Sequence, residues 1–324
     1  MRVFLTGGTG FIGSAVLSRL LVAGHEVICT YRRAATLKEL RLDVVPNDNK
    51  LRFRHCDITD PELVHKVIAE QDFDVLIHMA CTSSWTELAR TNVFSVALDG
   101  TKNLVNACQA KGRQPIFVYI SSGAAAGAQS EIGGNLEAVS TNYANAKRKT
   151  EEYLLEHQNL FKKLIILRPA EVYAPNDIHL VTAGNLLEYA RGGLAFIPRG
   201  GMAIVHRDDV ADSIVNSLTR GIHGKIYYLG GPNVTLSEFA RVIQKLTGKG
   251  AYEIPLHLPM RLLAGLIWLG KCLHLTQFDP NLAVYCSMYW FGDSTEAIQD
   301  LGHRVRTPDE VLRDAVQSIT TGAL

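Results

Sequence analysis

The 324-residue sequence lacks the features that mark several specialised classes of protein. Its six cysteines are scattered without a CxxC pair, which argues against a disulfide framework and against a zinc site. We therefore expect buried thiols in a reducing compartment and no metal site. An excess of one charge is also absent, because 33 Lys and Arg residues stand against 32 acidic residues. The net charge of +1 favours neither a nucleic-acid partner nor an anionic membrane surface.

Long hydrophobic runs are missing as well. The most apolar stretch, residues 262–270, lies between Arg261 and Lys271 and has about half the length that spans a bilayer. We expect a buried or lid helix there and no membrane contact. Met1 leads directly into an apolar segment, which leaves no room for a signal or transit peptide, so we expect a cytoplasmic protein.

The most informative segment that is present lies at the start of the chain. An apolar run over residues 2–6 leads into Gly7, Gly10 and Gly13, and a helical pattern follows. Glycine permits a tight turn and lets backbone N–H groups approach a ligand, while the N-terminus of the next helix favours an anion. This arrangement predicts a site for the pyrophosphate of a dinucleotide.

Apolar runs and helical periodicity alternate through the first half of the sequence. Strands are expected near residues 2–6, 26–31, 51–56, 74–79, 116–121 and 163–168, and helices near 11–23, 60–70, 88–111 and 143–157. Such alternation predicts an α/β fold built on a doubly wound parallel sheet, the Rossmann arrangement.

The pattern loosens after residue 168 and then recovers. A helix is expected over 208–218 and a strand over 225–229, and capping boxes begin two further helices at Thr235 and Thr307. We interpret residues 1–168 as a dinucleotide-binding domain. Residues 169–324 are interpreted as a smaller C-terminal α/β lobe that binds substrate and is interleaved with the last strands of the sheet.

The end of the second expected strand favours NADP over NAD. In dinucleotide folds a carboxylate at this place binds the ribose 2′-hydroxyl, whereas arginine accommodates a 2′-phosphate. Here the strand ends in Arg32 and Arg33, with no acidic residue. The alternative is that both are solvated loop residues.

Two further segments lie where a dinucleotide would bind. Asp57 and Ile58 follow the third strand, at the place for an adenine amino group, although Asp57 also suits a turn or a cap. Met79 and Ala80 end the fourth strand beside the expected ribose.

A tyrosine and a lysine four residues apart suggest chemistry. Tyr143 and Lys147 share one face of a helix, so the ammonium can lower the phenol pKa from about 10 toward neutrality. A phenol tuned in this way can donate a proton to a carbonyl or accept one from an alcohol. The strand over 116–121 ends in Ser121 and Ser122, at the sheet edge where ligands of such folds bind.

With these motifs the chain resembles an extended short-chain dehydrogenase/reductase of the NAD-dependent epimerase/dehydratase superfamily. The matching segments are TGGTGFIG at 6–13, the serines 121–122, YANAK at 143–147, LRPAEVYAP at 167–175 and VHRDDVA at 205–211. The resemblance implies that Ser122 orients the substrate oxygen, that Tyr143 is the acid/base and that Lys147 also binds the nicotinamide ribose. It further implies that the dinucleotide contacts Gly7, Thr9, Gly10, Phe11, Ile12, Gly13 and Pro169. Members often dimerise through the two long helices near 88–111 and 143–157, so a homodimer is an expectation.

Departures from the family pattern bear on the reaction. Dehydratases carry an Asp-Glu pair after the strand-five hydroxyls, whereas Gly123 and three alanines stand here, which disfavours dehydration. Met202 and about Ala283 replace two arginines that clamp the diphosphate in nucleotide-sugar epimerases. Residues 185–187 still resemble a nucleotide-contacting segment of those epimerases. Ala97 stands where many members have an asparagine, so a proton relay through that side chain would run through water or substrate.

The C-terminal half resembles the dihydroflavonol-reductase-like and hydroxysteroid-dehydrogenase-like branches. Apolar residues at 258–268 and the run Tyr289-Trp290-Phe291 suit either a substrate pocket or ordinary core packing. The interpretation is an NADPH-dependent reductase of a ketone or aldehyde on a small apolar or aromatic substrate. The alternatives are a nucleotide-sugar epimerase or ketoreductase with tightly bound NAD(P), and a non-catalytic redox sensor. His206 and Asp209 are read as structural, with Asp209 as a helix cap.

Overall fold

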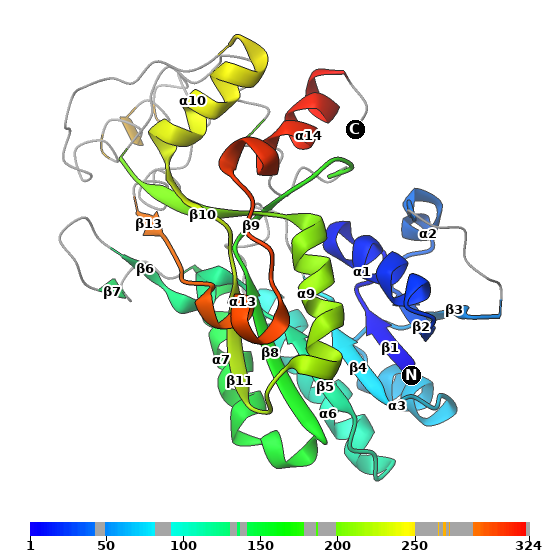
Figure 1. Ribbon diagram of the computed structural model, residues 1–324. Helices are drawn as coiled ribbons and strands as arrows, with labels where there is room; N and C mark the ends of the chain where they lie inside the picture. The colour runs from blue at the N-terminus through cyan, green and yellow to red at the C-terminus, as the bar shows by residue number, and fades with distance from the viewer. Residues whose placement is uncertain are drawn as a thin grey trace.

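The computed structural model describes residues 1–42, 49–81, 92–129, 135–136, 141–177, 186, 199–249, 265, 268–269, 272 and 288–321. Its centre is a seven-stranded sheet in the order β11-β8-β5-β4-β1-β2-β3, in which every neighbouring pair is parallel. The strands are β1 (Arg2–Thr6), β2 (Glu26–Tyr31), β3 (Leu51–His55), β4 (Val75–His78), β5 (Ile116–Ile120), β8 (Lys163–Pro169) and β11 (Lys225–Leu229). The doubly wound parallel sheet is therefore confirmed (Figure 1).

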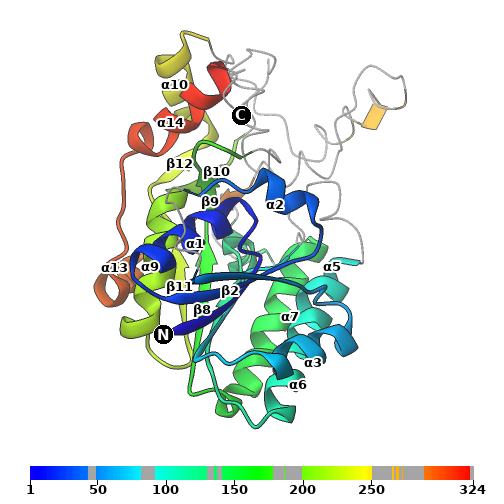
Figure 2. The same cartoon turned by 90° about the vertical axis from the view of Figure 1, so that its right-hand side faces the viewer.

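Helices cover both faces of this sheet. The helices of the described residues are α1 (Phe11–Val22), α2 (Ala35–Glu39), α3 (Pro61–Glu70), α5 (Asn92–Phe94), α6 (Gly100–Ala110), α7 (Asn142–Glu156), α9 (Arg207–Arg220), α10 (Leu236–Thr247), α13 (Thr295–Leu301) and α14 (Pro308–Thr320), with a π-helical turn η1 (Ser95–Asp99) and the 3-10 turns η2 (Gly123–Ala126) and η4 (Gln158–Leu160). Figure 2 shows α1, α9 and α13 on one face and α3, α6 and α7 on the other.

The alternation of strand side chains produces these two layers. In β1, Val3 and Leu5 pack in the core cluster beneath α1 and α9, whereas Phe4 packs in the cluster beneath α3 and α6. Both faces are apolar, because a parallel sheet covered by helices has no solvated face. The expected apolar runs are thus explained by burial on two sides.

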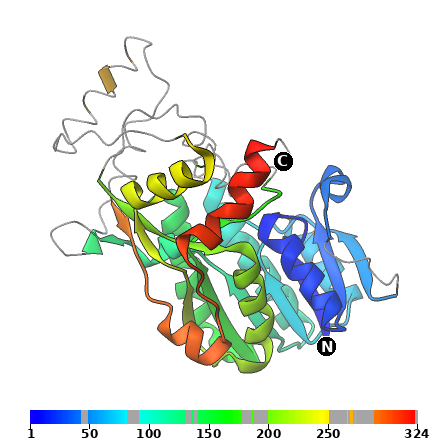
Figure 3. The same ribbon diagram turned by 45° about the horizontal axis from the view of Figure 1, so that its top comes forward.

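A second, smaller sheet lies beside the first and is built largely from later residues. Its order is β12-β10-β13-β6-β7, and β9 pairs with β10. The strands are β6 (Ala128–Gln129), β7 (Asn135–Leu136), β9 (Glu171–Tyr173), β10 (Gly201–His206), β12 (Asn233–Thr235) and β13 (Tyr289–Trp290). Helices α10 and α14 pack on it through a shared core cluster (Figure 3).

The capping signals read from the sequence are confirmed with one exception. Thr235 and Thr307 each form a complete capping box at the start of α10 and α14. The expectation that Asp209 caps α9 is wrong. His206 occupies the cap and its ring nitrogen accepts from the backbone N–H of Asp208, while the buried Asp209 carboxylate binds Arg306 at 2.6 and 3.0 Å.

The apolar stretch at residues 258–270 is described at only a few positions. Trp268 exposes 60% of its surface, whereas residues 258–264 and Ile267 fall outside the described part of the chain, as do Asn185 and Ala283. None of the helices that the structure describes is long and apolar enough to cross a lipid bilayer.

Candidate active site

A cavity of about 630 Å³ lies at the carboxyl edge of the parallel sheet. Residues that directly follow β1, β2, β3, β4, β5 and β8 all line it, so it gathers positions far apart in the sequence. Every site residue predicted from the sequence lines this cavity: Gly7, Thr9, Gly10, Phe11, Ile12, Gly13, Arg32, Arg33, Asp57, Ile58, Met79, Ala80, Ser122, Tyr143, Lys147 and Pro169. Their individual roles remain predictions.

The glycine-rich turn between β1 and α1 requires glycine at two positions. Gly7 has a φ of +75°, and a Cβ added there would lie 2.6 Å from the backbone nitrogen of Ala80. A Cβ at Gly13 would lie 2.0 Å from the carbonyl oxygen of Gly7. The turn therefore packs backbone against backbone, and it brings the N-terminus of α1 to the cavity, where an anion is favoured.

A buried hydrogen-bond chain ties this turn to the neighbouring strand. Thr6 Oγ accepts from two backbone N–H groups after β4, so its proton goes to Nδ1 of His78, 2.7 Å away. Nε2 of His78 then donates to Thr101, and Thr101 donates to the carbonyl of Ala97 in η1. Burial, assisted by the charge of Lys147, lowers the pKa of His78 to about 3, so the ring is neutral.

Arginines and one aspartate surround the far end of the cavity. Arg32 and Arg33 are exposed and follow β2, as predicted. Asp57 accepts from the backbone N–H and the hydroxyl of Thr59, at 3.0 and 2.8 Å, so it forms a turn. Burial raises the pKa of Asp57, but these hydrogen bonds and the charge of Arg32 outweigh it and keep that pKa below its usual value.

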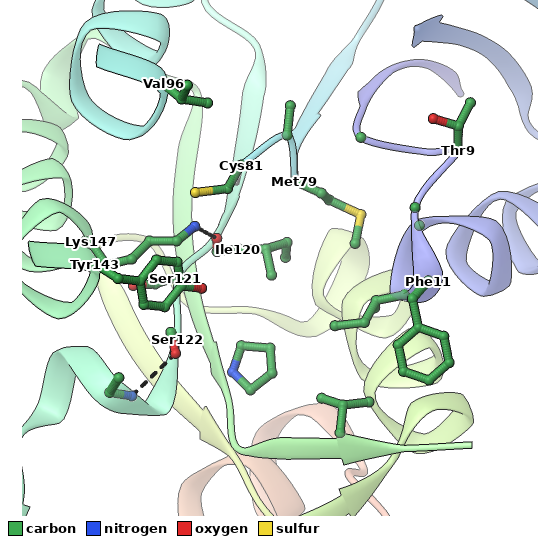
Figure 4. A pocket seen from close by; sticks show the side chains of 18 of the residues that line it. Thr9, Phe11, Met79, Cys81, Val96, Ile120, Ser121, Ser122, Tyr143 and Lys147 are labelled. Carbon is green, nitrogen blue, oxygen red and sulfur yellow. Dashed lines mark hydrogen bonds between the residues drawn. The ribbon is translucent and has the colours of Figure 1, made fainter. Parts of the chain in front are cut away.

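The proposed catalytic side chains meet at the opposite end (Figure 4). Thr141 caps α7 by accepting from the N–H of Ala144, and the helix then carries Tyr143 and Lys147 on one face. The buried ammonium of Lys147 donates to the carbonyl of Ile120 at 2.8 Å and lies 5.8 Å from the centre of the Tyr143 ring.

The pKa of the Tyr143 phenol differs from the expectation. Burial raises it to about 12, while the charge of Lys147 and hydrogen bonding with Ser122 act in the opposite direction without reversing the shift. The prediction that Lys147 brings this pKa toward neutrality is therefore wrong for this geometry. The phenol is protonated at neutral pH, which is the form that donates a proton.

Two residues of the cavity wall, Glu171 and Tyr228, were not singled out from the sequence, whereas Trp290 belongs to the run 289–291 that was considered as a pocket wall. Glu171 in β9, Tyr228 in β11 and Trp290 in β13 all line the cavity. Glu171 carries a signal that could have found it, because it is the only charged residue in the segment 169–175. Nothing in the sequence separates Tyr228 from its neighbour Tyr227.

Comparison with known proteins agrees with this architecture. The model of the NAD dependent epimerase/dehydratase family matches residues 3–230. The chain is 26% identical to a putative dihydroflavonol 4-reductase of Synechocystis over 97% of this chain and 93% of that one. It is 30% identical to a UDP-glucose 4-epimerase of Mycolicibacterium smegmatis over 60% of this chain and 64% of that one. The structure superposes on the Thermus thermophilus UDP-glucose 4-epimerase complex with NAD, with a TM-score of 0.74, 22% identity and full coverage of both chains.

Proposed function

The chain belongs to the NAD-dependent epimerase/dehydratase family, and we propose that it is an NADPH-dependent reductase of a ketone or aldehyde on a small apolar or aromatic substrate. The observation that carries this proposal is the meeting of Ser122, Tyr143 and Lys147 at one end of a cavity whose other end holds the glycine turn and two arginines. A nicotinamide dinucleotide, when bound, supplies the hydride.

The residues of the cavity fit such a cofactor. The surrounding backbone leaves no space for a side chain at Gly7 or Gly13. Backbone N–H groups at the start of α1 can therefore approach a bound pyrophosphate. Arg32 and Arg33 would hold a ribose 2′-phosphate, and Lys147 would bind the nicotinamide ribose.

The chemistry follows from the state of the three side chains. Ser122 donates a hydrogen bond to the substrate carbonyl and orients it. The protonated phenol of Tyr143 then gives its proton to the carbonyl oxygen as that oxygen gains negative charge. The ammonium of Lys147, fixed by the Ile120 carbonyl, stabilises the phenolate that forms.

Other reactions of the family are less well supported by this cavity. Dehydration requires an additional acid and base after Ser122, whereas the turn η2 consists of Gly123 and three alanines. Met202 packs in the core of the second sheet, so that position offers no cation to a diphosphate. The apolar side chains of Ala203 and Trp290 line the substrate end, which supports an apolar substrate.

The test is calorimetric titration of cofactor-stripped protein with NADPH and NADH, followed by assays of NADPH oxidation with aromatic, steroidal and sugar-nucleotide carbonyl compounds. We expect preferential binding of NADPH and net oxidation with an apolar carbonyl. Tight NAD(H) with interconversion of a nucleotide sugar and no net redox change would instead establish the epimerase alternative, which the relative from Mycolicibacterium supports. Dinucleotide binding without turnover of any of these substrates would favour the redox sensor.

A further inference from the structure

Three glycines clear the space that the ring of Tyr228 occupies. A Cβ added at Gly123, Gly230 or Gly292 would lie 3.1, 2.4 or 2.2 Å from ring carbons of Tyr228. These glycines belong to three separate segments of the chain, in η2, after β11 and after β13. The position of this ring is therefore fixed from several sides at once.

The hydroxyl group of Tyr228 points toward the residue that follows Ser122. The Cβ position of Gly123 is 3.3 Å from the Tyr228 hydroxyl oxygen and 3.2 Å from the carbonyl oxygen of Pro169. Tyr228 itself lines the cavity, and its hydroxyl has no hydrogen-bond partner among the residues that the structure describes. A phenol held next to the proposed carbonyl site thus retains an unused donor and acceptor.

A carboxyl group accompanies this phenol. Glu171 lies on β9, where Ile204 is its partner in the sheet, and the residue lines the same cavity. Burial raises the pKa of Glu171 to about 7, and the carboxylate is close enough to raise the pKa of Tyr228. Within the described part of the chain, no cation or hydrogen-bond donor is paired with it. Glu171 is half-buried, and a carboxyl group in a cavity wall that has no partner among the described residues is available to hydrogen-bond a ligand.

We propose that Glu171 and Tyr228 form a polar subsite for a hydroxyl group of the substrate, beside the carbonyl held by Ser122 and Tyr143. This inference rests on the proposed function and narrows its substrate class to hydroxylated ketones or aldehydes, or diols in the reverse direction. A hydroxyl group satisfies both residues together, because it donates to the carboxylate and accepts from the phenol.

The pair also explains how an otherwise apolar pocket selects its substrate. Adding a hydroxyl changes binding little in a purely apolar pocket, whereas a pocket built to hydrogen-bond a hydroxyl rejects the analogue that lacks it. The subsite therefore determines which substrate is bound, and Glu171 and Tyr228 are specificity-determining residues in this proposal.

The experiment measures binding, so that it does not depend on turnover. NADPH-saturated protein is titrated with 1-phenyl-1,2-ethanediol and with 1-phenylethanol, neither of which can be oxidised while the cofactor is already reduced. We expect the wild type to prefer the diol by about tenfold, which corresponds to about 1.4 kcal/mol. Glu171→Gln and Tyr228→Phe should each remove most of this preference, with the alcohol as the internal reference.

Tyr227→Phe is the matched control for the loss of a phenol. Tyr227 adjoins Tyr228 on β11, but its hydroxyl donates to Asp300 at 3.0 Å and does not line the cavity. This variant should keep the preference for the diol, even where the loss of its hydrogen bond lowers the melting temperature.

Several results would overturn the subsite. One is equal affinity of the wild type for the diol and the alcohol, and another is no binding of the diol. A third is that the variants weaken the binding of both ligands equally. A preference for 2-amino-1-phenylethanol would assign a cation site instead.

Reduction of acetophenone without any preference for the diol would overturn the subsite and leave the reductase proposal intact. A preference for the diol that the variants remove, without turnover of any carbonyl compound, would overturn the reductase proposal alone.

Discussion

The guanidinium group of Arg168 and the carboxylate of Glu151 form a bidentate ion pair between strand β8 and helix α7. Nε of Arg168 donates to one carboxylate oxygen at 2.9 Å and Nη2 donates to the other. The Glu151 side chain is 3% exposed and that of Arg168 is 21% exposed. Because Glu151 lies one helical turn after Lys147, the pair holds the face of α7 that carries Tyr143 and Lys147 against the sheet.

Glu151→Ala should lower the free energy of unfolding by about 3 kcal/mol, because it leaves a largely buried guanidinium without its counter-charge. Urea denaturation measures the change. Glu152→Ala is the control, since the next residue is exposed and its loss should change stability by about 0.5 kcal/mol or less. Equal losses for the two variants would show that the ion pair contributes little.

Replacing both arginines at the end of β2, in the variant Arg32→Ser/Arg33→Ser, should weaken NADPH binding about tenfold or more. The reason is the loss of charge-assisted hydrogen bonds to the 2′-phosphate, so NADH affinity should change little. Calorimetry at low and high salt checks this, because salt should reduce the effect. Arg41→Ser is the control, as Arg41 is exposed and does not line the cavity. Equal weakening of both dinucleotides would contradict the assignment.

Most of the main sheet could be predicted from the sequence, but the second sheet could not. Strands buried on two faces leave apolar runs such as 116–120, and helices between them leave a 3.6-residue period. Strands β6 and β13 have two residues each, which is too short for any period. Their positions depend on pairing between distant segments, such as Gly201 with Tyr289.

The site residues that belong to sequence motifs could be predicted, whereas those placed by tertiary packing could not. The spacing of the glycines and the spacing of Tyr143 and Lys147 are local properties, so both could be identified from the sequence. The high pKa of Tyr143 results from burial, which helix spacing does not encode. Tyr228 was missed because its place in the cavity depends on Gly230 and Gly292, which become its neighbours only in the folded chain.

Tyr143→Phe should lower kcat for carbonyl reduction by 100-fold to 10,000-fold, on the order expected for a lost general acid. Binding of NADPH should stay within about twofold, because the phenol is proposed to act on the substrate carbonyl and not to hold the dinucleotide. In the wild type, activity should persist through neutral pH, since the phenol keeps its proton there. Tyr153→Phe on the same helix is the control, as this tyrosine does not line the cavity. Unchanged turnover in Tyr143→Phe would remove the proposed mechanism.

His78 should make the protein less stable in acid. Its pKa is lowered from 6.5 to about 3 by burial, so below pH 6.5 the unfolded chain binds a proton that the folded chain does not. Stability should therefore fall by about 2 kcal/mol between pH 6.5 and pH 5 through this group. His78→Gln should lose that part of the pH dependence in urea denaturation, whereas His65→Gln, at an exposed position on α3, should retain it. The same slope in all three proteins would contradict a neutral buried imidazole.

Glu171 should act in the opposite direction over an overlapping pH range. Its pKa is raised from 4.5 to about 7 by burial, so between these values the folded protein keeps a proton that the unfolded chain has released. Stability through this group should thus fall as pH rises from about 4.5 to about 7, by up to about 3 kcal/mol, and stay level above that range. Glu171→Gln cannot ionise, so its stability relative to the wild type should increase with pH across the same interval. Urea denaturation at pH 5 and pH 7.5 measures the difference, and Glu152→Gln, exposed on α7, is the control. A difference that stays constant with pH would mean that Glu171 ionises normally, and the carboxyl group of the subsite would then be hydrated rather than buried in the cavity wall.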